Sequence, residues 1–269
     1  MRQVGRYDID DPGKIQGRDE VNPSDRSVAA IRLNHCLDAL SDTSGTVLIL
    51  GCGAGRYVRA MKRVRPDLRV IGCDLSVSAL HEAVAADRDG EYIALDASVL
   101  PFADDSIQAV VFFDLIEHVP AYEEMLADIG RVLVYDGVFH FYTPLEDQPR
   151  SIYHLLKNSS RLPLRTWKQD HVGHINFFRA QDVFRDIWHA GFRVEDARYG
   201  FHPFGQVHDL VDYWQRERVG GASGVLPISA VRMVARVTFL FTWRLSYFED
   251  RLYEGPTLAS GLHLTARMR

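Results

Sequence analysis

Short apolar runs alternate with amphipathic stretches through the middle of the chain. The run Val47–Leu50 is wholly apolar and ends in glycines, and Ala109–Phe113 is also apolar throughout. Strands that are apolar on both faces are typical of parallel sheets covered by helices on both sides. We expect strands at 47–50, 70–73, 92–95, 109–113, 132–142, 192–198 and 262–266, and helices at 27–40, 57–64, 121–129 and 181–190.

This alternation predicts an α/β fold, built on a doubly wound, mostly parallel seven-stranded sheet of Rossmann-like type. Residues 1–40 are expected to form an N-terminal arm and helix, and residues 41–200 the core. The rhythm breaks at 145–176, where we expect a long loop or short helices. Residues 201–256 are helical in pattern and rich in aromatics, which favours a lid inserted before a last core strand within 257–269.

A glycine-rich turn follows the first apolar strand and precedes a helix, with the sequence Gly51-Cys52-Gly53-Ala54-Gly55. Glycines let a ligand approach the backbone closely, and the N-terminus of the helix offers free N–H groups. A dinucleotide fingerprint needs G-x-G-x-x-G, and Arg56 stands where its third glycine would fall. The spacing G-x-G-x-G therefore disfavours NAD and FAD.

Acidic residues end the next two strands. Asp74 closes the second strand, where a carboxylate can accept hydrogen bonds from a ribose diol, and Asp96 follows the third. Either residue alone would be explained by a turn or a helix cap. At the carboxyl ends of successive strands, the two together suit a nucleoside that lies across the edge of the sheet.

These segments resemble the class I S-adenosylmethionine (SAM)-dependent methyltransferases, in the branch that acts mainly on small metabolites. The resemblance covers roughly residues 47–198. It rests on VLILGCGAGRY (47–57), VIGCDLS (70–76), LDASVLPFADDSIQAVVFFDLIEHV (95–119), IGRVLVYDGVFHFYTP (129–144) and DHVGHINFFRAQDVFRDIWHAGFRV (170–194). The chain departs from the family at Ile49, where members commonly carry an acid that helps to hold the SAM ammonium, and at Gln108, where they often have Asp.

The resemblance implies an enzyme (EC 2.1.1.-) with SAM as its cofactor and assigns a role to several residues. The loop glycines would cradle the methionine part, Asp74 would bind the ribose, and Asp96 with Ala97 the adenine. Asp114, just after the fourth strand, would lie near the transferring methyl group. The expected cofactor contacts are Gly51, Cys52, Gly53, Gly55, Asp74, Leu75, Asp96, Ala97 and Asp114.

Methyl transfer needs a base only if the acceptor must lose a proton. His118, His171 and His174 are the candidates, with Asp170 placed to orient His171, although each imidazole could equally be a local structural group. Glu117 and His118 also belong to a D-x-x-E-H pattern that begins at Asp114 and is similar to the acidic cluster of metal-assisted ubiquinone-pathway O-methyltransferases. We expect no metal here.

Composition and charge limit the classes of partner and the cellular locations that we expect for this protein. The 269 residues carry a formal net charge of −5 and no Lys/Arg block, which disfavours a nucleic-acid substrate. Three cysteines without CxxC spacing and an N-terminus without an apolar stretch favour the cytoplasm over secretion. The apolar stretch Val225–Leu245 is interrupted by Arg232, Arg236 and Arg244, which disfavours a membrane span.

The leading prediction is methylation, at O, N or C, of a small acceptor that is apolar or aromatic. One alternative is a methyltransferase for an isoprenoid or lipid, docked on a membrane through residues 225–248. A second is a SAM-binding sensor or partner protein without catalysis, an alternative that Ile49 keeps open. For the apolar side chains of 225–248 we expect burial against the core first, a homodimer contact second and lipid third.

Overall fold

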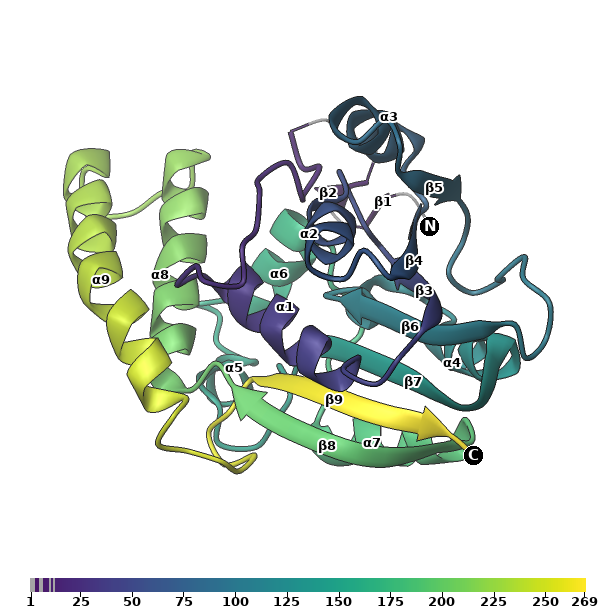
Figure 1. Ribbon diagram of the computed structural model, residues 1–269. Helices are drawn as coiled ribbons and strands as arrows, with labels where there is room; N and C mark the ends of the chain where they lie inside the picture. The colour runs from purple at the N-terminus through teal and green to yellow at the C-terminus, as the bar shows by residue number, and fades with distance from the viewer. Residues whose placement is uncertain (1–2, 5–6, 10, 12) are drawn as a thin grey trace.

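A seven-stranded sheet forms the centre of the molecule (Figure 1). The structure is a computed structural model that describes residues 3–4, 7–9, 11 and 13–269. The order of the strands across the sheet is β5-β4-β3-β6-β7-β9-β8. Their bounds are β3 (Gly45–Leu50), β4 (Leu68–Asp74), β5 (Glu91–Ala94), β6 (Ile107–Phe113), β7 (Leu133–Pro144), β8 (Phe192–Gly200) and β9 (Gly261–Met268).

Six of these strands run in the same direction, and only β9 runs the other way, antiparallel to both of its neighbours, β7 and β8. The expected doubly wound, mostly parallel sheet is therefore confirmed. Part of the expected N-terminal arm lies outside the described residues. Within the described part, β1 (Gln3–Val4) and β2 (Tyr7–Asp8) pair as a two-stranded sheet.

Helices cover both faces of the sheet, as the wholly apolar strands require. Successive strand residues point to opposite faces. Leu48 and Leu50 of β3 accordingly join one buried cluster, and Val47 and Ile49 join the other. The helices are α1 (Val28–Ala39), α2 (Arg56–Val64), α3 (Val77–Ala86), α4 (Tyr122–Val132), α5 (Ile152–Leu156), α6 (Leu164–Val172), α7 (Ala180–His189), α8 (Pro203–Val219) and α9 (Ile228–Glu249), with a short 3₁₀ turn, η1 (Ile116–His118).

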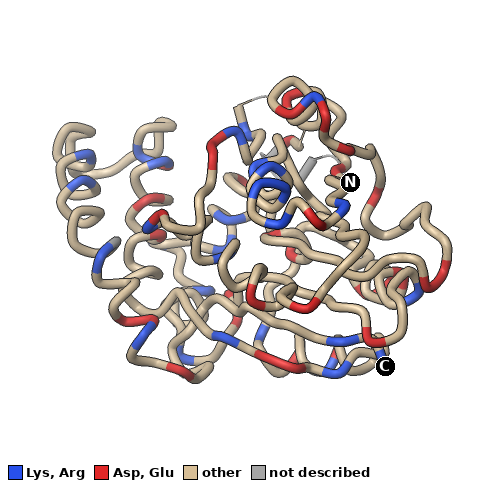
Figure 2. Tube along the Cα trace, in the orientation of Figure 1, with Lys and Arg blue, Asp and Glu red and all other residues tan. Residues whose placement is uncertain are grey.

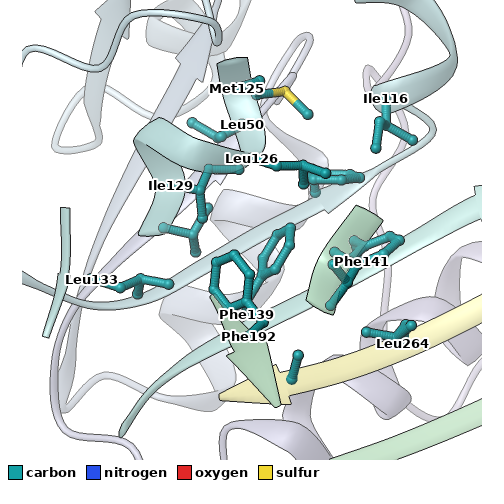
Figure 3. Close-up of a cluster of buried hydrophobic side chains, with 14 of the residues drawn as sticks. Leu50, Ile116, Met125, Leu126, Ile129, Leu133, Phe139, Phe141, Phe192 and Leu264 are labelled. Carbon is teal, nitrogen blue, oxygen red and sulfur yellow. The ribbon is translucent and has the colours of Figure 1, made fainter. Parts of the chain in front are cut away.

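The larger cluster packs α4 and α7 against the sheet (Figure 3). Met125, Leu126 and Ile129 recur at helical spacing on α4, which is why this face of the helix is buried. They meet aromatic side chains of β7 and β8, among which the rings of Phe139 and Phe192 lie 5.0 Å apart. This packing fixes the carboxyl ends of β6 and β7, where the candidate site lies.

Local signals set the element boundaries. The helix expected at 27–40 is α1, and its N-cap Ser27 accepts a hydrogen bond from Ala30 N. Ser76 caps α3 in the same way through Ala79 N. Residues 145–176, expected to be a loop or short helices, contain α5 and α6.

Helices α8 and α9 lie side by side at one end of the molecule, with α9 outermost (Figure 1). They occupy most of the segment expected to form a lid. Within the described ranges, no helix has the length and hydrophobicity to cross a lipid bilayer.

Candidate active site

The glycine loop adopts a conformation that side chains would resist. Gly51, Gly53 and Gly55 have φ values of 65°, 56° and 85°, in the left-handed region that favours glycine. A Cβ at Gly53 would lie 2.5 Å from the carbonyl oxygen of Gln16, which also accepts a hydrogen bond of 2.8 Å from Ala54 N. The N-terminal segment therefore covers the loop, a contact that sequence reasoning missed because Gln16 carries no motif.

Asp74 ties the loop to the end of β4. Its Oδ2 accepts a hydrogen bond of 2.7 Å from Gly53 N, and its Oδ1 accepts one of 2.8 Å from Ser76 N. Burial raises the pKa of the carboxyl group, against the lowering effect of these backbone donors. Each oxygen keeps a lone pair for a further donor, so the carboxylate can still accept hydrogen bonds from a ribose diol.

The other predicted cofactor residues follow the same edge of the sheet. Asp96 Oδ1 accepts hydrogen bonds from the backbone N and the hydroxyl of Ser98, which lower the pKa of Asp96. Cys52 is buried, whereas Leu75 and Ala97 are only partly covered. No further contact identifies the roles of these three, which stay predictions.

Asp114 ends β6 at a positive φ of 51° and forms an ion pair with Arg32 of α1. Its Oδ1 accepts a hydrogen bond of 3.0 Å from one terminal nitrogen of that guanidinium. The guanidinium also lies 4.0 Å from the centre of the Tyr142 ring. Sequence reasoning missed Arg32, because only the fold brings it to a strand end 82 positions later.

Two buried polar atoms at this place lack a partner among the residues that the structure describes. They are Arg32 Nε and the hydroxyl of Tyr57, the second residue of α2. Buried donors without a partner are costly, so a missing ligand is a natural explanation. A carboxylate, such as that of the methionine part of SAM, could accept from both. The residues present therefore fit the expected cofactor from the ribose site to its amino-acid end.

Ile49 is buried within β3, between β4 and β6, with 1% of its surface exposed. The acid expected from the family pattern is thus replaced by a core side chain. The strands on either side of β3 lead to Asp74 and Asp114, and Arg32 already pairs with Asp114.

The structure brings two of the three candidate histidines together. The rings of His118 and His174 lie 4.9 Å apart, and the Nδ1 of His174 lies 2.9 Å from Glu146 Oε1. Burial lowers the pKa of His118 to about 4, so its imidazole is neutral at pH 7. Burial alone would raise the pKa of Glu146, but His174 and Lys168 hold it at about 2.

His171 lies apart from this pair. It belongs to α6, one of the short helices within residues 145–176. Its Nε2 lies 2.6 Å from Glu217 Oε1 of α8, and its ring lies 5.9 Å from that of Tyr213. In this position His171 ties α6 to α8, and its catalytic role stays a prediction.

One group of side chains has the geometry of a metal-ligand set. Glu117, His118 and His174 each offer a ligand atom, and these atoms lie within 4.8 Å of one another. Carboxylate and imidazole together suit several divalent cations. The D-x-x-E-H pattern contributes only its last two members, because Asp114 pairs with Arg32 instead. The expectation of a metal-free site stays a prediction.

A cavity of about 70 Å³ opens beside Tyr142, on the side of β7 that faces α1. The next residue, Thr143, points to the opposite face and lies 3.4 Å from Glu117. The cavity and the histidine pair are therefore on opposite sides of β7. The cavity is lined by Val28, Ile31, Tyr142, Gly200, Phe201, Gly205, His208, Thr242, Ser246, Tyr247, Asp250 and His263.

Comparison with known proteins identifies the domain. Residues 48–141 match the family model described as "Methyltransferase domain". These residues form a class I SAM-dependent methyltransferase domain. The resemblance seen in the sequence is confirmed for this domain, and with it the expected methyltransferase class of the domain and its use of SAM.

Two curated relatives of this methyltransferase domain match part of the chain. A ubiquinone/menaquinone biosynthesis C-methyltransferase of Desulfotalea psychrophila is 34% identical over 48% of this chain and 50% of its own length. A demethylmenaquinone methyltransferase of Thermotoga maritima is 35% identical over 34% of this chain and 40% of its own. The chain thus spans half or less of the curated relatives it matches.

Solved structures share the fold over most of the chain. The geranyl diphosphate C-methyltransferase of Streptomyces coelicolor, solved with Mg²⁺, geranyl diphosphate and S-adenosylhomocysteine, has a TM-score of 0.60 and 14% identity. The match covers 90% of this chain and 81% of that one. At this identity the likeness concerns the fold alone.

Proposed function

We propose that this protein transfers the methyl group of SAM to an apolar small molecule held between the core sheet and helices α8 and α9. The observation that carries the proposal is the cavity beside Tyr142. The Tyr142 ring lines it and also touches Arg32, whose partner Asp114 stands at the expected methyl end of the cofactor. An acceptor in the cavity would lie next to that end.

The lining of the cavity favours an apolar acceptor. Hydrocarbon and aromatic surface dominates, with a few polar groups such as Ser246 and His263 to orient a ligand. The names of the two curated relatives and of the structural neighbour agree with this class, since they concern quinone biosynthesis, demethylmenaquinone and geranyl diphosphate.

The cavity is too small for such an acceptor as it stands. Ligand pockets usually hold roughly 300–1,000 Å³, compared with about 70 Å³ here. Helices α8 and α9 would have to move to admit the acceptor, which is the role of a lid. The exposed segment Gly220–Gly224 joins the two helices, so cleavage by a protease at this segment would report their movement.

The reaction itself needs little from the protein. A nucleophilic atom of the acceptor attacks the methyl carbon, the carbon–sulfur bond breaks, and S-adenosylhomocysteine leaves. SAM supplies an already activated methyl group. The chain aligns the two reactants and excludes water. If the acceptor must lose a proton, the proposed base is one of the two histidines that line the cavity, His208 or His263. The pair His118 and His174 lies on the other side of β7, so this proposal gives it no part in proton transfer.

The test is production of S-adenosylhomocysteine from SAM with a panel of prenylated and simple phenols and quinols. Ser246→Phe should fill the cavity and raise the KM for the acceptor at least tenfold, with unchanged SAM affinity. Ser229→Phe is the matched control, because it places the same side chain on an exposed position of α9.

Three results would count against the proposal. SAM binding without turnover of any acceptor would favour a non-catalytic sensor. Equal behaviour of the two phenylalanine variants would place the acceptor elsewhere. Proteolysis near Gly220–Gly224 should also slow when SAM and acceptor are present, and equal cleavage with and without them would rule out a moving lid.

A further inference from the structure

The outermost helix of the molecule carries an exposed apolar face. Met233, Leu240, Phe241 and Phe248 of α9 are between 62% and 65% exposed. Other apolar side chains of this face and of the segment before it are also exposed: Val225, Leu226, Ile228, Val234, Val237 and Leu245. The expectation that the core would bury residues 225–248 is therefore wrong for this face.

The helix has two faces with different surroundings. Val231, Ala235 and Thr242 are buried toward the rest of the molecule. With 100° between successive residues, Met233 and Leu240 fall on the side of the helix opposite those three. Both sides of α9 are thus apolar, whereas a surface helix normally turns a polar face outward.

Apart from the buried Glu249 at its last position, the charges on α9 all have one sign. Ile228 to Phe248 contains Arg232, Arg236 and Arg244 and no acidic residue. All three arginines are exposed, and none forms an ion pair with a residue that the structure describes. Figure 2 shows these positive positions along the outermost helix, without negative ones beside them until its end.

These charges argue against a second copy of the chain as the partner. In a two-fold symmetric contact through this face, the arginines of both copies would lie in one interface. The face offers no carboxylate to neutralise them, and unpaired charges in an interface are costly. An anionic bilayer surface suits both the apolar side chains and the arginines of this face. The apolar side chains can insert among the acyl chains, and the headgroup phosphates can accept hydrogen bonds from the guanidinium groups.

We propose that the outer face of α9 binds the surface of an anionic lipid bilayer, with its apolar side chains inserted and its arginines on headgroup phosphates. The helix lies in the plane of the surface and does not cross it. Its inner face, through Thr242, Ser246 and Tyr247, lines the cavity beside Tyr142. Membrane contact would therefore place the cavity next to the phase in which apolar compounds dissolve.

The experiment is co-sedimentation of the full chain with vesicles, either phosphatidylcholine alone or phosphatidylcholine with phosphatidylglycerol, at low and high salt. The mixed vesicles should bind the protein, and salt should weaken the binding. Each arginine near an anionic surface contributes about fivefold, so Arg232→Gln, Arg236→Gln and Arg244→Gln together should weaken it about 100-fold. Leu240→Glu with Phe241→Glu should abolish it.

The matched control is Tyr135→Glu with Leu155→Glu, which changes two exposed apolar side chains on other elements and should bind like the unaltered chain. Thermal unfolding at similar temperatures would show that all variants fold. Failure of the unaltered chain to bind mixed vesicles, or equal loss in the control, would overturn the proposal. So would a dimer that Leu240→Glu with Phe241→Glu dissociates. Binding is measured without turnover, so it is independent of the proposed function.

Discussion

Replacement of Asp74 separates its role toward the cofactor from its role in the loop. In the structure, Asp74 holds Gly53 N at 2.7 Å and Ser76 N at 2.8 Å. A ribose diol would add two hydrogen bonds to the same carboxylate. Bonds to a charged acceptor contribute roughly 1.5–3 kcal/mol each. Asp74→Ala should therefore weaken SAM binding at least about 100-fold, and Asp74→Asn, which keeps one acceptor, about tenfold.

Calorimetric titration with SAM and with S-adenosylhomocysteine measures the effect, and urea unfolding measures the structural part separately. Ser76→Ala is the control, since it removes the N-cap of α3, at a cost of about 1 kcal/mol in stability, and leaves the backbone N–H on Asp74. Its SAM affinity should stay within about twofold. Because burial raises the pKa of Asp74, SAM affinity should also fall as the carboxylate is protonated at acidic pH, more steeply than in Asp74→Asn. Less than a threefold loss in Asp74→Ala would show that the ribose binds elsewhere.

Three further predictions follow from single contacts. Burial lowers the pKa of His140 to about 3, so between pH 6.5 and 3 the unfolded chain binds a proton that the folded chain does not. The free energy of unfolding should therefore decrease as the pH is lowered through this window, and it should decrease less steeply in His140→Gln, as urea midpoints would show. A double-mutant cycle of Arg32→Met and Asp114→Asn should give a coupling energy of about 1 kcal/mol, whereas a value near zero would mean that the ion pair does not form in solution. Gly53→Ala places a Cβ 2.5 Å from a backbone oxygen, so hydrogen exchange should show a loosened N-terminal segment, and SAM affinity should fall at least about tenfold.

The expected cofactor residues could be chosen from the sequence because their positions at strand ends are encoded locally. Each expected residue stands at the end of a strand whose apolar run is visible, and a parallel sheet brings such ends to one edge. Asp74 and Ser76 show this directly, since a strand end and a helix cap two positions later together hold the loop. The seven strands could be placed for the same reason.

The arrangement of Arg32 and of the candidate histidines depends on contacts between segments that are far apart in the sequence, and no local pattern reveals such contacts. Arg32 reaches Asp114 across 82 positions, and His174 is held by Glu146 on a different segment. Sequence reasoning could identify the histidines as candidates, but it could not show that His118 and His174 meet while His171 faces α8. From the sequence alone, Arg32 cannot be distinguished from any other surface arginine on an amphipathic helix.

Helix α9 shows a different limit. Its sequence is largely apolar but is interrupted by three arginines, and burial of its apolar side chains against the core was the first expectation. The structure instead packs one side, at Val231 and Ala235, and leaves Met233 and Leu240 uncovered. The sequence indicates that the apolar side chains of α9 must be covered, but the partner that covers them need not belong to the same chain. The three arginines decide between the remaining partners, because a hydrocarbon surface of protein would leave their charges unpaired and an anionic lipid surface would pair them.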